Sequence, residues 1–191
     1  MTTFLTSDTH YYHNNVIEYS NRPFRDLEEM HDTLVNNWNT VVKKNDIVYH
    51  LGDFCLTTNV SQIQAILRRL NGKIRLIQGN HDKWVKKIDI IDPDRKIEWV
   101  KSYHQEKFTI GNIVYPVVMM HFPIHKWDKC HFGSYHFHGH SHGTIDSDNS
   151  NIRRYDVGVD ANGATFTPIS LEMAIDRMVY REAMIHHGVI D

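Results

Sequence analysis

The sequence predicts an α/β fold, and two observations carry this prediction. In residues 1–82, three runs rich in apolar and β-branched residues alternate with segments of helical periodicity, the order that parallel strands joined by crossover helices produce. From Phe108 onward, short β-rich runs follow one another, and this part is antiparallel β in character. With 191 residues, the chain is expected to form one domain, residues 1–191, with a core that needs no disulfide.

Three strands are expected in the first half, at residues 4–6, 47–51 and 74–77. A short helix follows the first strand, over residues 14–19, and Pro23 then breaks the chain. Each strand is therefore separated from the next by helical sequence. This order predicts parallel strands whose carboxyl ends lie at one edge of a sheet.

Two longer helices are expected between these strands. The first begins at Asp26, which can cap free amides, and Glu29 has the reciprocal position of a capping box. His31 lies on this helix and has no metal-binding neighbour in sequence, so it is expected at the surface or rim. The second helix covers residues 60–70, and Asn71-Gly72 directly after it supplies the stop signal of a helix end.

After Asp82 a short helical stretch carries three lysines and ends at Pro93. Lys83, Lys86 and Lys87 could attract a phosphate-bearing substrate, although a solvated helix face is the better interpretation.

The second half begins with a hairpin. Residues 108–110 and 113–120 flank Gly111-Asn112, a two-residue hairpin turn. Further elements are expected as strands near residues 134–138, 155–159 and 165–167, a loop at residues 146–151, and a final helix from Ser170 to Gly188.

Composition limits the function classes. A net charge of −2 argues against extended nucleic-acid binding, whose affinity comes from many phosphate contacts, but leaves a small anionic substrate open. The chain shows no leader and no apolar run of membrane-spanning length, so a soluble, cytoplasmic protein without a membrane partner is expected. Cys55 and Cys130 favour a reducing compartment, with a single bridge left open. Cys55 is expected to be a small buried residue, in preference to a metal ligand.

Metal-binding and proton-transferring side chains follow five of the β-rich runs. Each run leads into a short polar loop, and the 15 histidines of the chain are far more than a protein of this length usually carries. The loops are Ser7-Asp8-Thr9-His10, Gly52-Asp53, Gly79-Asn80-His81-Asp82, His121 and Gly139-His140-Ser141-His142.

The donors in these loops predict two metal ions. They form a mixed oxygen and nitrogen set suited to borderline divalent ions, and seven donors exceed what one ion uses. Asp53 is the natural bridge, which gives each ion four protein ligands and leaves positions for water and substrate. Asp8 with His10, and His140 with His142, are expected on extended segments, where alternate side chains share one face. The seven donors are Asp8, His10, Asp53, Asn80, His121, His140 and His142.

These five ordered motifs resemble those of the calcineurin-like metallophosphoesterase superfamily, over residues 8–142. Ser7-Asp8-Thr9-His10, a second His-Asn at His13-Asn14, and Arg22-Pro23-Phe24 further resemble a small bacterial and phage subgroup. The resemblance implies a two-sheet β-sandwich flanked by helices, and hydrolysis of a phosphodiester or phosphomonoester by a metal-activated water. His81 would protonate the leaving group, and Asp82 would orient His81.

The resemblance also divides the ligands. Asp8, His10, Asp53 and His142 would hold one ion, and Asp53, Asn80, His121 and His140 the other. Manganese is the ion expected first, with iron, zinc, nickel and magnesium as alternatives. A small phosphorylated or nucleotide-type substrate would contact Asn80 and His81 together with His13 and Asn14, while the loop at Pro123, His125 and Trp127 would also shape the site.

Two alternatives stay open at this point. Gly52-Asp53 runs into Phe54, and His81 is followed by Asp82; both depart from the protein serine/threonine phosphatases of the superfamily and count against that activity. A non-catalytic metal-binding scaffold or protein-interaction subunit is the other alternative. Because neither the proton donor nor a ligand is lost, the enzyme is favoured.

Overall fold

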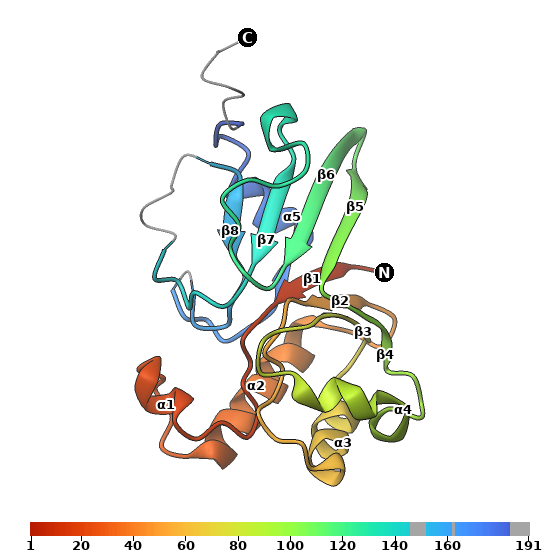
Figure 1. Ribbon diagram of the computed structural model, residues 1–191, viewed down its shortest axis with the longest axis vertical. Coiled ribbons are helices and arrows are strands. Elements are labelled where there is room, and N and C mark those ends of the chain that lie inside the picture. Colours follow the sequence, from red (N-terminus) through yellow and green to blue (C-terminus); the bar gives the residue numbers. More distant parts are fainter. Residues whose placement is uncertain (146–151, 162, 184–191) are drawn as a thin grey trace.

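Two β-sheets with helices packed against them make up the structure, a computed structural model that describes residues 1–145, 152–161 and 163–183 (Figure 1). The sheets have the strand orders β4-β3-β2-β1-β9 and β5-β6-β7-β8. The strands are β1 (Thr3–Thr6), β2 (Ile47–His50), β3 (Lys73–Ile77), β4 (Ile97–Lys101), β5 (Tyr103–Ile110), β6 (Ile113–Met120), β7 (Tyr135–His138), β8 (Arg154–Asp156) and β9 (Ile169–Ser170). The helices are α1 (Val16–Tyr19), α2 (Leu27–Val41), α3 (Val60–Arg69), α4 (Ile88–Ile91) and α5 (Leu171–Asp176), with 3-10 turns η1 (Lys83–Lys87) and η2 (Cys130–Phe132).

The first sheet contains the parallel strands that the alternation predicted. β1, β2 and β3 pair in parallel, and β4, which the sequence patterns did not indicate, adds a fourth parallel strand beside β3. β9 closes the other edge antiparallel to β1, in place of the strand expected at residues 165–167. That expectation was wrong because Ala164 and Phe166 adopt left-handed backbone angles, φ 50° and 51°, which a strand does not accommodate.

The second sheet is mixed. β5 and β6 form the predicted antiparallel hairpin around Gly111-Asn112. β6, β7 and β8, however, pair in parallel, so the antiparallel character expected of the whole second half was wrong. The segments that join these strands are long enough to return to the starting edge, as a parallel connection requires. The carboxyl ends of β6, β7 and β8 therefore share one edge.

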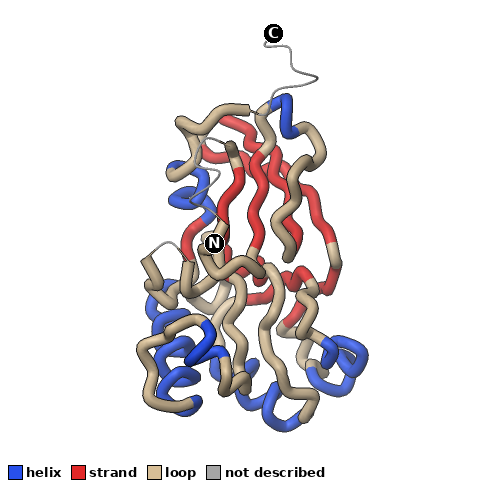
Figure 2. Tube along the Cα trace, turned by 60° about the vertical axis from the view of Figure 1, so that its left-hand side comes forward, coloured by secondary structure: helices blue, strands red, loops and turns tan. Residues whose placement is uncertain are grey.

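Apolar residues occupy two layers, one on each face of the first sheet. Phe4, Val48 and Ile74 pack toward the helices, whereas Leu5 and Tyr49 face the second sheet and α5. Successive side chains of a strand point to opposite faces, so a sheet covered on both sides buries both sets. Figure 2 shows most of the helical residues gathered on one side of the strands.

Local signals account for the helices. Asp26 accepts a hydrogen bond from Glu29 N at 2.9 Å and caps α2, although the Glu29 carboxylate accepts from Arg25 N and not from Asp26 N. Asn59 caps α3 and Ser170 caps α5. α5 begins where predicted but ends at Asp176, so the helix expected over residues 177–183 was wrong. The expected helix end at Gly188 and the loop expected at residues 146–151 lie outside the described residues.

His31 is not a rim residue, as its position on α2 suggested. It is 8% exposed, and its Nε2 accepts a hydrogen bond from Tyr12 N at 2.9 Å. It packs against the rings of Tyr11 and Tyr12. The helix thus uses a histidine to satisfy a backbone amide of the segment that follows β1, which no local sequence pattern discloses.

Both cysteines are buried free thiols, as expected for Cys55. No helix in the described part of the chain is long and apolar enough to cross a bilayer.

Candidate metal centre

The five polar loops meet at one edge of the two sheets. Asp8 and Asp53 follow β1 and β2, which run in parallel, and the segment from Gly79 to Asp82 follows β3. His121 and the segment from Gly139 to His142 follow β6 and β7, which also run in parallel. Because parallel strands end at the same edge of a sheet, this topology gathers the chemistry-bearing side chains in one place.

Asp8, His10 and His142 form the first cluster, with one potential ligand atom of each within 4.8 Å of the others. The Nε2 atoms of His10 and His142 lie 3.8 Å and 3.9 Å from Asp8 Oδ1. Ligand atoms about 2.1 Å from a common ion are separated by about 3.0–3.4 Å in octahedral or tetrahedral geometry. The spacing is therefore close to that of a coordination shell.

Asp53, His121 and His140 form the second cluster under the same criterion. His121 Nδ1 donates to the carbonyl of Leu51 at 2.8 Å, which leaves Nε2 directed at the cluster. The Oδ1 atom of Asn80 lies 3.1 Å from His121 Nε2 and adds an amide oxygen. Asp53, Asn80, His121 and His140 are thus within reach of one ion.

One carboxylate oxygen lies between the clusters. Asp53 Oδ2 is 3.6 Å from His10 Nε2 and 3.5 Å from His121 Nε2. The other oxygen, Oδ1, accepts a hydrogen bond from His81 N at 2.8 Å. Asp53 is therefore held by one oxygen while the second is equally close to both clusters.

Buried polar atoms without partners mark the first cluster. Among the described residues, Asp8 Oδ1 and His10 Nε2 are inaccessible to solvent and have no hydrogen-bond partner. Such atoms are costly unless a ligand satisfies them. Asp8 Oδ2 is engaged, because it accepts from His140 N at 2.9 Å. The donor set and these two atoms fit a bound divalent cation.

The pKa values of side chains in both clusters also indicate a functional site. Burial raises the pKa of Asp8 to about 7, against the opposing effect of His121 and His142, and burial lowers that of His10 to about 2. Burial alone would lower the pKa of His121, but the carboxylates of Asp53 and Asp8 raise it to about 9. Strong perturbation in a cleft is typical of functional sites, and a cation would relieve the unfavourable burial of Asp8.

The backbone at these ligands is unusual. Asp8, His10, Asp53, His140 and His142 all have positive φ, between 47° and 66°. Asp8 and His10, like His140 and His142, therefore do not lie on extended segments, and the expectation that alternation aims them was wrong. Left-handed turns aim them instead. Sparsely populated backbone conformations of this kind cluster at functional sites.

Two glycines allow the loops to approach closely. A Cβ at Gly79 would lie 2.2 Å from Asp53 Oδ1, and one at Gly139 would lie 2.3 Å from Asp8 Oδ2. No side chain fits at these distances, so both positions require glycine.

His81 lies at the mouth of the site. Its side chain is 37% exposed, and its Nε2 is 4.0 Å from Asp53 Oδ2. A ring beside the clusters and open to solvent can reach a bound substrate.

Asp82 has partners other than those the resemblance implied. Its Oδ2 accepts from Asp53 N and Gly79 N, each at 2.8 Å, and its Oδ1 accepts from Phe54 N and Trp84 Nε1, each at 2.9 Å. No hydrogen bond joins it to the His81 ring among the described contacts. The Asp82 carboxylate therefore ties the loops after β2 and β3 to each other instead of orienting His81.

A cleft of about 520 Å³ opens over both clusters. His13 lines it and contacts His10, with 3.1 Å between their Nδ1 atoms, whereas Asn14 is exposed and is not among the lining residues. The residues that line the cleft are His10, His13, Val16, Tyr19, Ser20, Asn21, Asp53, Asn80, His81, His140, Ser141, His142, Thr144 and Asp160.

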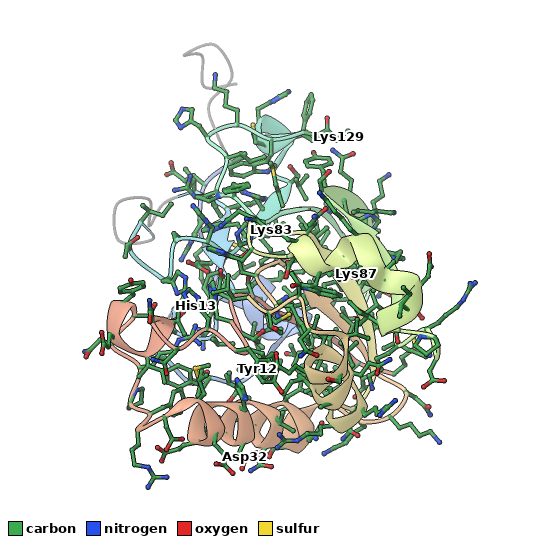
Figure 3. All side chains as sticks on the ribbon, turned by 60° about the horizontal axis from the view of Figure 1, so that its bottom comes forward. Tyr12, His13, Asp32, Lys83, Lys87 and Lys129 are labelled. Atoms are coloured by element: carbon green, nitrogen blue, oxygen red, sulfur yellow. The ribbon has the colours of Figure 1, made fainter. Side chains whose placement is uncertain are left out.

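The other candidate substrate residues lie away from this cleft. Trp127 is buried and donates from Nε1 to the carbonyl of Ser134 at 3.1 Å, so it supports its own loop. Neither Pro123 nor His125 lines the cleft. Lys83 and Lys87, labelled in Figure 3, are exposed residues of the turn η1, and they do not line the cleft either.

Several cleft residues had no signal in the sequence. Tyr19 lines the cleft beside His13 and is 75% exposed. Phe122 does not line the cleft but lies next to it, with its ring centroid 4.6 Å from that of His140. Asp160 comes from the segment after β8, which carries none of the five motifs. Single aromatic and acidic residues in loops have no periodicity, so only the fold brings them to the site.

Comparison with known proteins gives consistent results. The family model described as calcineurin-like phosphoesterase matches residues 1–157. An uncharacterized protein of Methanocaldococcus jannaschii is 35% identical over 175 residues, which cover 90% of this chain and 88% of that protein. The gene 66 protein of Mycobacterium phage L5 is 40% identical over 82 residues, 42% of this chain and 39% of that protein. A crystal structure of a protein of unknown function from Aquifex aeolicus has the same fold, with a TM-score of 0.67, 23% identity, and coverage of 92% of this chain and 98% of that one.

Proposed function

Because the chain belongs to the calcineurin-like phosphoesterase family, we propose that it is a metal-dependent hydrolase of phosphodiester or phosphomonoester bonds. Small phosphorylated or nucleotide-type molecules are the proposed substrates, since the cleft of about 520 Å³ suits a compact ligand.

The position of Asp53 Oδ2 carries this proposal. It lies 3.6 Å from His10 Nε2 and 3.5 Å from His121 Nε2, so one carboxylate serves both clusters. If two divalent ions were bound there, they would supply a water of lowered pKa and positive charge for the attacking and leaving oxygens of a phosphoryl transfer. The expected ligands are Asp8, His10, Asp53 and His142 for one ion, and Asp53, Asn80, His121 and His140 for the other.

His81 is the proposed proton donor to the leaving oxygen. Its ring lines the cleft beside Asp53 and is 37% exposed, so it can reach a phosphoryl group placed over the clusters. An imidazole changes protonation near neutral pH and is suited to general acid catalysis.

His13 and Asn80 are the proposed substrate contacts of the cleft wall. His13 Nδ1 faces His10, and the ring of His13 lies 5.7 Å from that of His81, centroid to centroid. If His10 binds the ion through Nε2, its Nδ1–H donates to His13, whose proton is then on Nε2 and available to a phosphate oxygen. Asn80 also lines the cleft and supplies an amide group.

Manganese is the proposed first choice of ion. The donor set mixes carboxylate, amide and imidazole groups, which suits borderline divalent ions, with iron, zinc, nickel and magnesium as alternatives.

A hydrolysis screen tests the proposal. Manganese-loaded protein is assayed against nucleotides, cyclic nucleotides, nucleic acids and phosphorylated small molecules, with Asp53→Asn as the inactive reference. Asp92→Asn is the control, because Asp92, like Asp53, is a buried carboxylate that accepts from the backbone, here from Lys96 N and Ile97 N, but it lies outside the cleft. Turnover by the wild type and by Asp92→Asn, and none by Asp53→Asn, is expected. A metal-loaded wild type without turnover on any class would favour a binding scaffold.

A further inference from the structure

The ligand His142 has a carboxylate on the side of its ring that faces away from the cluster. Its Nδ1 lies 3.0 Å and 2.9 Å from Asp160 Oδ1 and Oδ2, and its Nε2 faces Asp8. Because Asp160 accepts a hydrogen bond from Nδ1–H, the ring keeps its lone pair on Nε2. Metal-binding histidines in general depend on such a partner, which sets their tautomer and orientation.

Asp160 is itself held by a buried arginine. Arg22 Nε and Nη2 lie 2.9 Å and 2.8 Å from Asp160 Oδ2, and the Arg22 side chain is fully buried. Its remaining donors contact the first metal loop, since Nη1 donates to the carbonyl of Thr9 at 3.0 Å and Nη2 to that of Asp8 at 2.6 Å. One guanidinium thus connects the ligand-bearing Asp8–His10 loop to the carboxylate that contacts His142.

We propose that Arg22 and Asp160 are positioning residues for the first metal site, through the chain of contacts from Arg22 to Asp160 to His142. Arg22 fixes the Asp8–His10 turn and the Asp160 carboxylate relative to each other, and Asp160 holds His142 with Nε2 toward the ion. The second cluster has a separate support, because His121 is oriented by the carbonyl of Leu51. The support of His121 therefore does not pass through Arg22 or Asp160.

Asp160 is not included in the match to the family. It lies after residue 157, where the family match ends, and outside the five motifs. A planar guanidinium with donors on two edges can hold a carboxylate and two carbonyls together, and a lysine cannot reproduce this geometry. Its complete burial, with contacts to Asp160 and to the carbonyls of Asp8 and Thr9, distinguishes Arg22 from a surface arginine.

The test measures metal binding at each site separately. In a His121→Ala background the remaining Mn²⁺ titration reports the first site, and in a His10→Ala background it reports the second. Asp160→Ala is added to each and followed by isothermal titration calorimetry of metal-free protein. We expect the affinity of the first site to fall by roughly 10–100-fold, the usual effect of losing a ligand's orienting partner, and that of the second site to stay within about twofold.

Two more conservative variants test the same contacts with less risk of misfolding. Asp160→Asn keeps the shape but places an amide N–H group next to His142 Nδ1, and Arg22→Lys keeps the charge but loses the forked geometry. Both are expected to weaken the first site selectively, with the thermal midpoint measured on the same samples. Asp92→Asn serves again as the control and is expected to leave both affinities unchanged.

Unchanged affinity of the first site in correctly folded Asp160→Ala or Asp160→Asn would overturn the proposal, and so would an equal loss at both sites. The proposal rests on the metal centre of the proposed function but not on hydrolysis. A wild type that binds two ions without turnover would overturn the hydrolase and leave this positioning role intact.

Discussion

Asp82→Asn separates two roles that the structure and the family resemblance assign differently. If Asp82 orients His81, the substitution should impair proton donation alone. If Asp82 joins the loops after β2 and β3, as its four hydrogen bonds indicate, the substitution should destabilise the fold and weaken metal binding.

The expected loss of stability in Asp82→Asn follows from the hydrogen bonds of the Asp82 carboxylate. The asparagine side chain keeps one acceptor oxygen, so two of the four donors, either the amides of Asp53 and Gly79 or the Phe54 amide and the Trp84 indole, lose their partner. Each unsatisfied buried donor costs about 1–3 kcal/mol, which gives about 2–6 kcal/mol for the pair. Burial raises the pKa of Asp82, so desolvation already offsets part of its hydrogen bonding, and the lower half of that range is expected.

Urea unfolding of the metal-free protein, followed by circular dichroism, measures this loss. Asp46→Asn is the matched control: Asp46 is buried and accepts from Thr2 N and Lys43 N, one per oxygen, so it loses a single hydrogen bond far from the cleft. Metal titrations of Asp82→Asn should show weaker binding at both sites, because Asp53 serves both, whereas those of Asp46→Asn should match the wild type.

A free energy of unfolding within about 1 kcal/mol of the wild type, together with normal metal affinities, would show that Asp82 does not hold the two loops together. Loss of activity confined to esters with basic leaving groups would instead restore the orienting role.

Three further predictions concern the centre and its surroundings. Asp53→Asn should abolish turnover and reduce the manganese content below the two ions per chain expected of the wild type, because two close cations need an anion between them; elemental analysis and assay of one sample check this. His81→Ala should retain both ions and slow esters with alkoxide leaving groups by roughly 10²–10⁴-fold, yet slow p-nitrophenyl esters much less, since nitrophenolate departs without a proton; equal losses on both would assign His81 to phosphate binding. Burial lowers the pKa of His31 from 6.5 to about 4, so the neutral ring is favoured in the fold; the stability it contributes is complete above pH 6.5 and is lost as the pH falls toward 4, by about 3 kcal/mol. Urea unfolding at pH 7 and pH 4.5 measures this loss. The free energy of unfolding of His31→Gln should fall less between the two pH values than that of the wild type, and an equal fall would contradict the prediction.

Much of the fold could be predicted because its signals are local. The capped helix α2, the helix α3 and the parallel order of β1, β2 and β3 each follow from spacing within a short window. β4 had no such signal, because its residues mix charged and apolar types at a sheet edge. The parallel pairing of β6, β7 and β8 depends on how long connections return across the sheet, which periodicity does not encode.

The candidate ligands could be identified because each one follows a strand and belongs to a compact motif. Their geometry could not, since alternation predicted extended backbone where the chain makes left-handed turns. The supports of the site were even less visible. Arg22 and Asp160 are 138 residues apart, and the partners of Asp82 lie on three different segments. Only tertiary structure brings such groups together.

The strain at the ligands explains why these supports are extensive. Left-handed backbone costs a non-glycine residue on the order of 1 kcal/mol or more, and five ligand positions adopt it. Hydrogen bonds offset this cost: Asp8 N and His10 N donate to the carbonyls of Gly52 and Asp53, and His140 N donates to Asp8 Oδ2. These bonds link one metal loop to another, so the strained turns stabilise each other only when all are in place. The ligands are consequently held near their binding geometry by the protein itself, and metal affinity should respond to substitutions such as Asp82→Asn and Asp160→Ala that touch no ion.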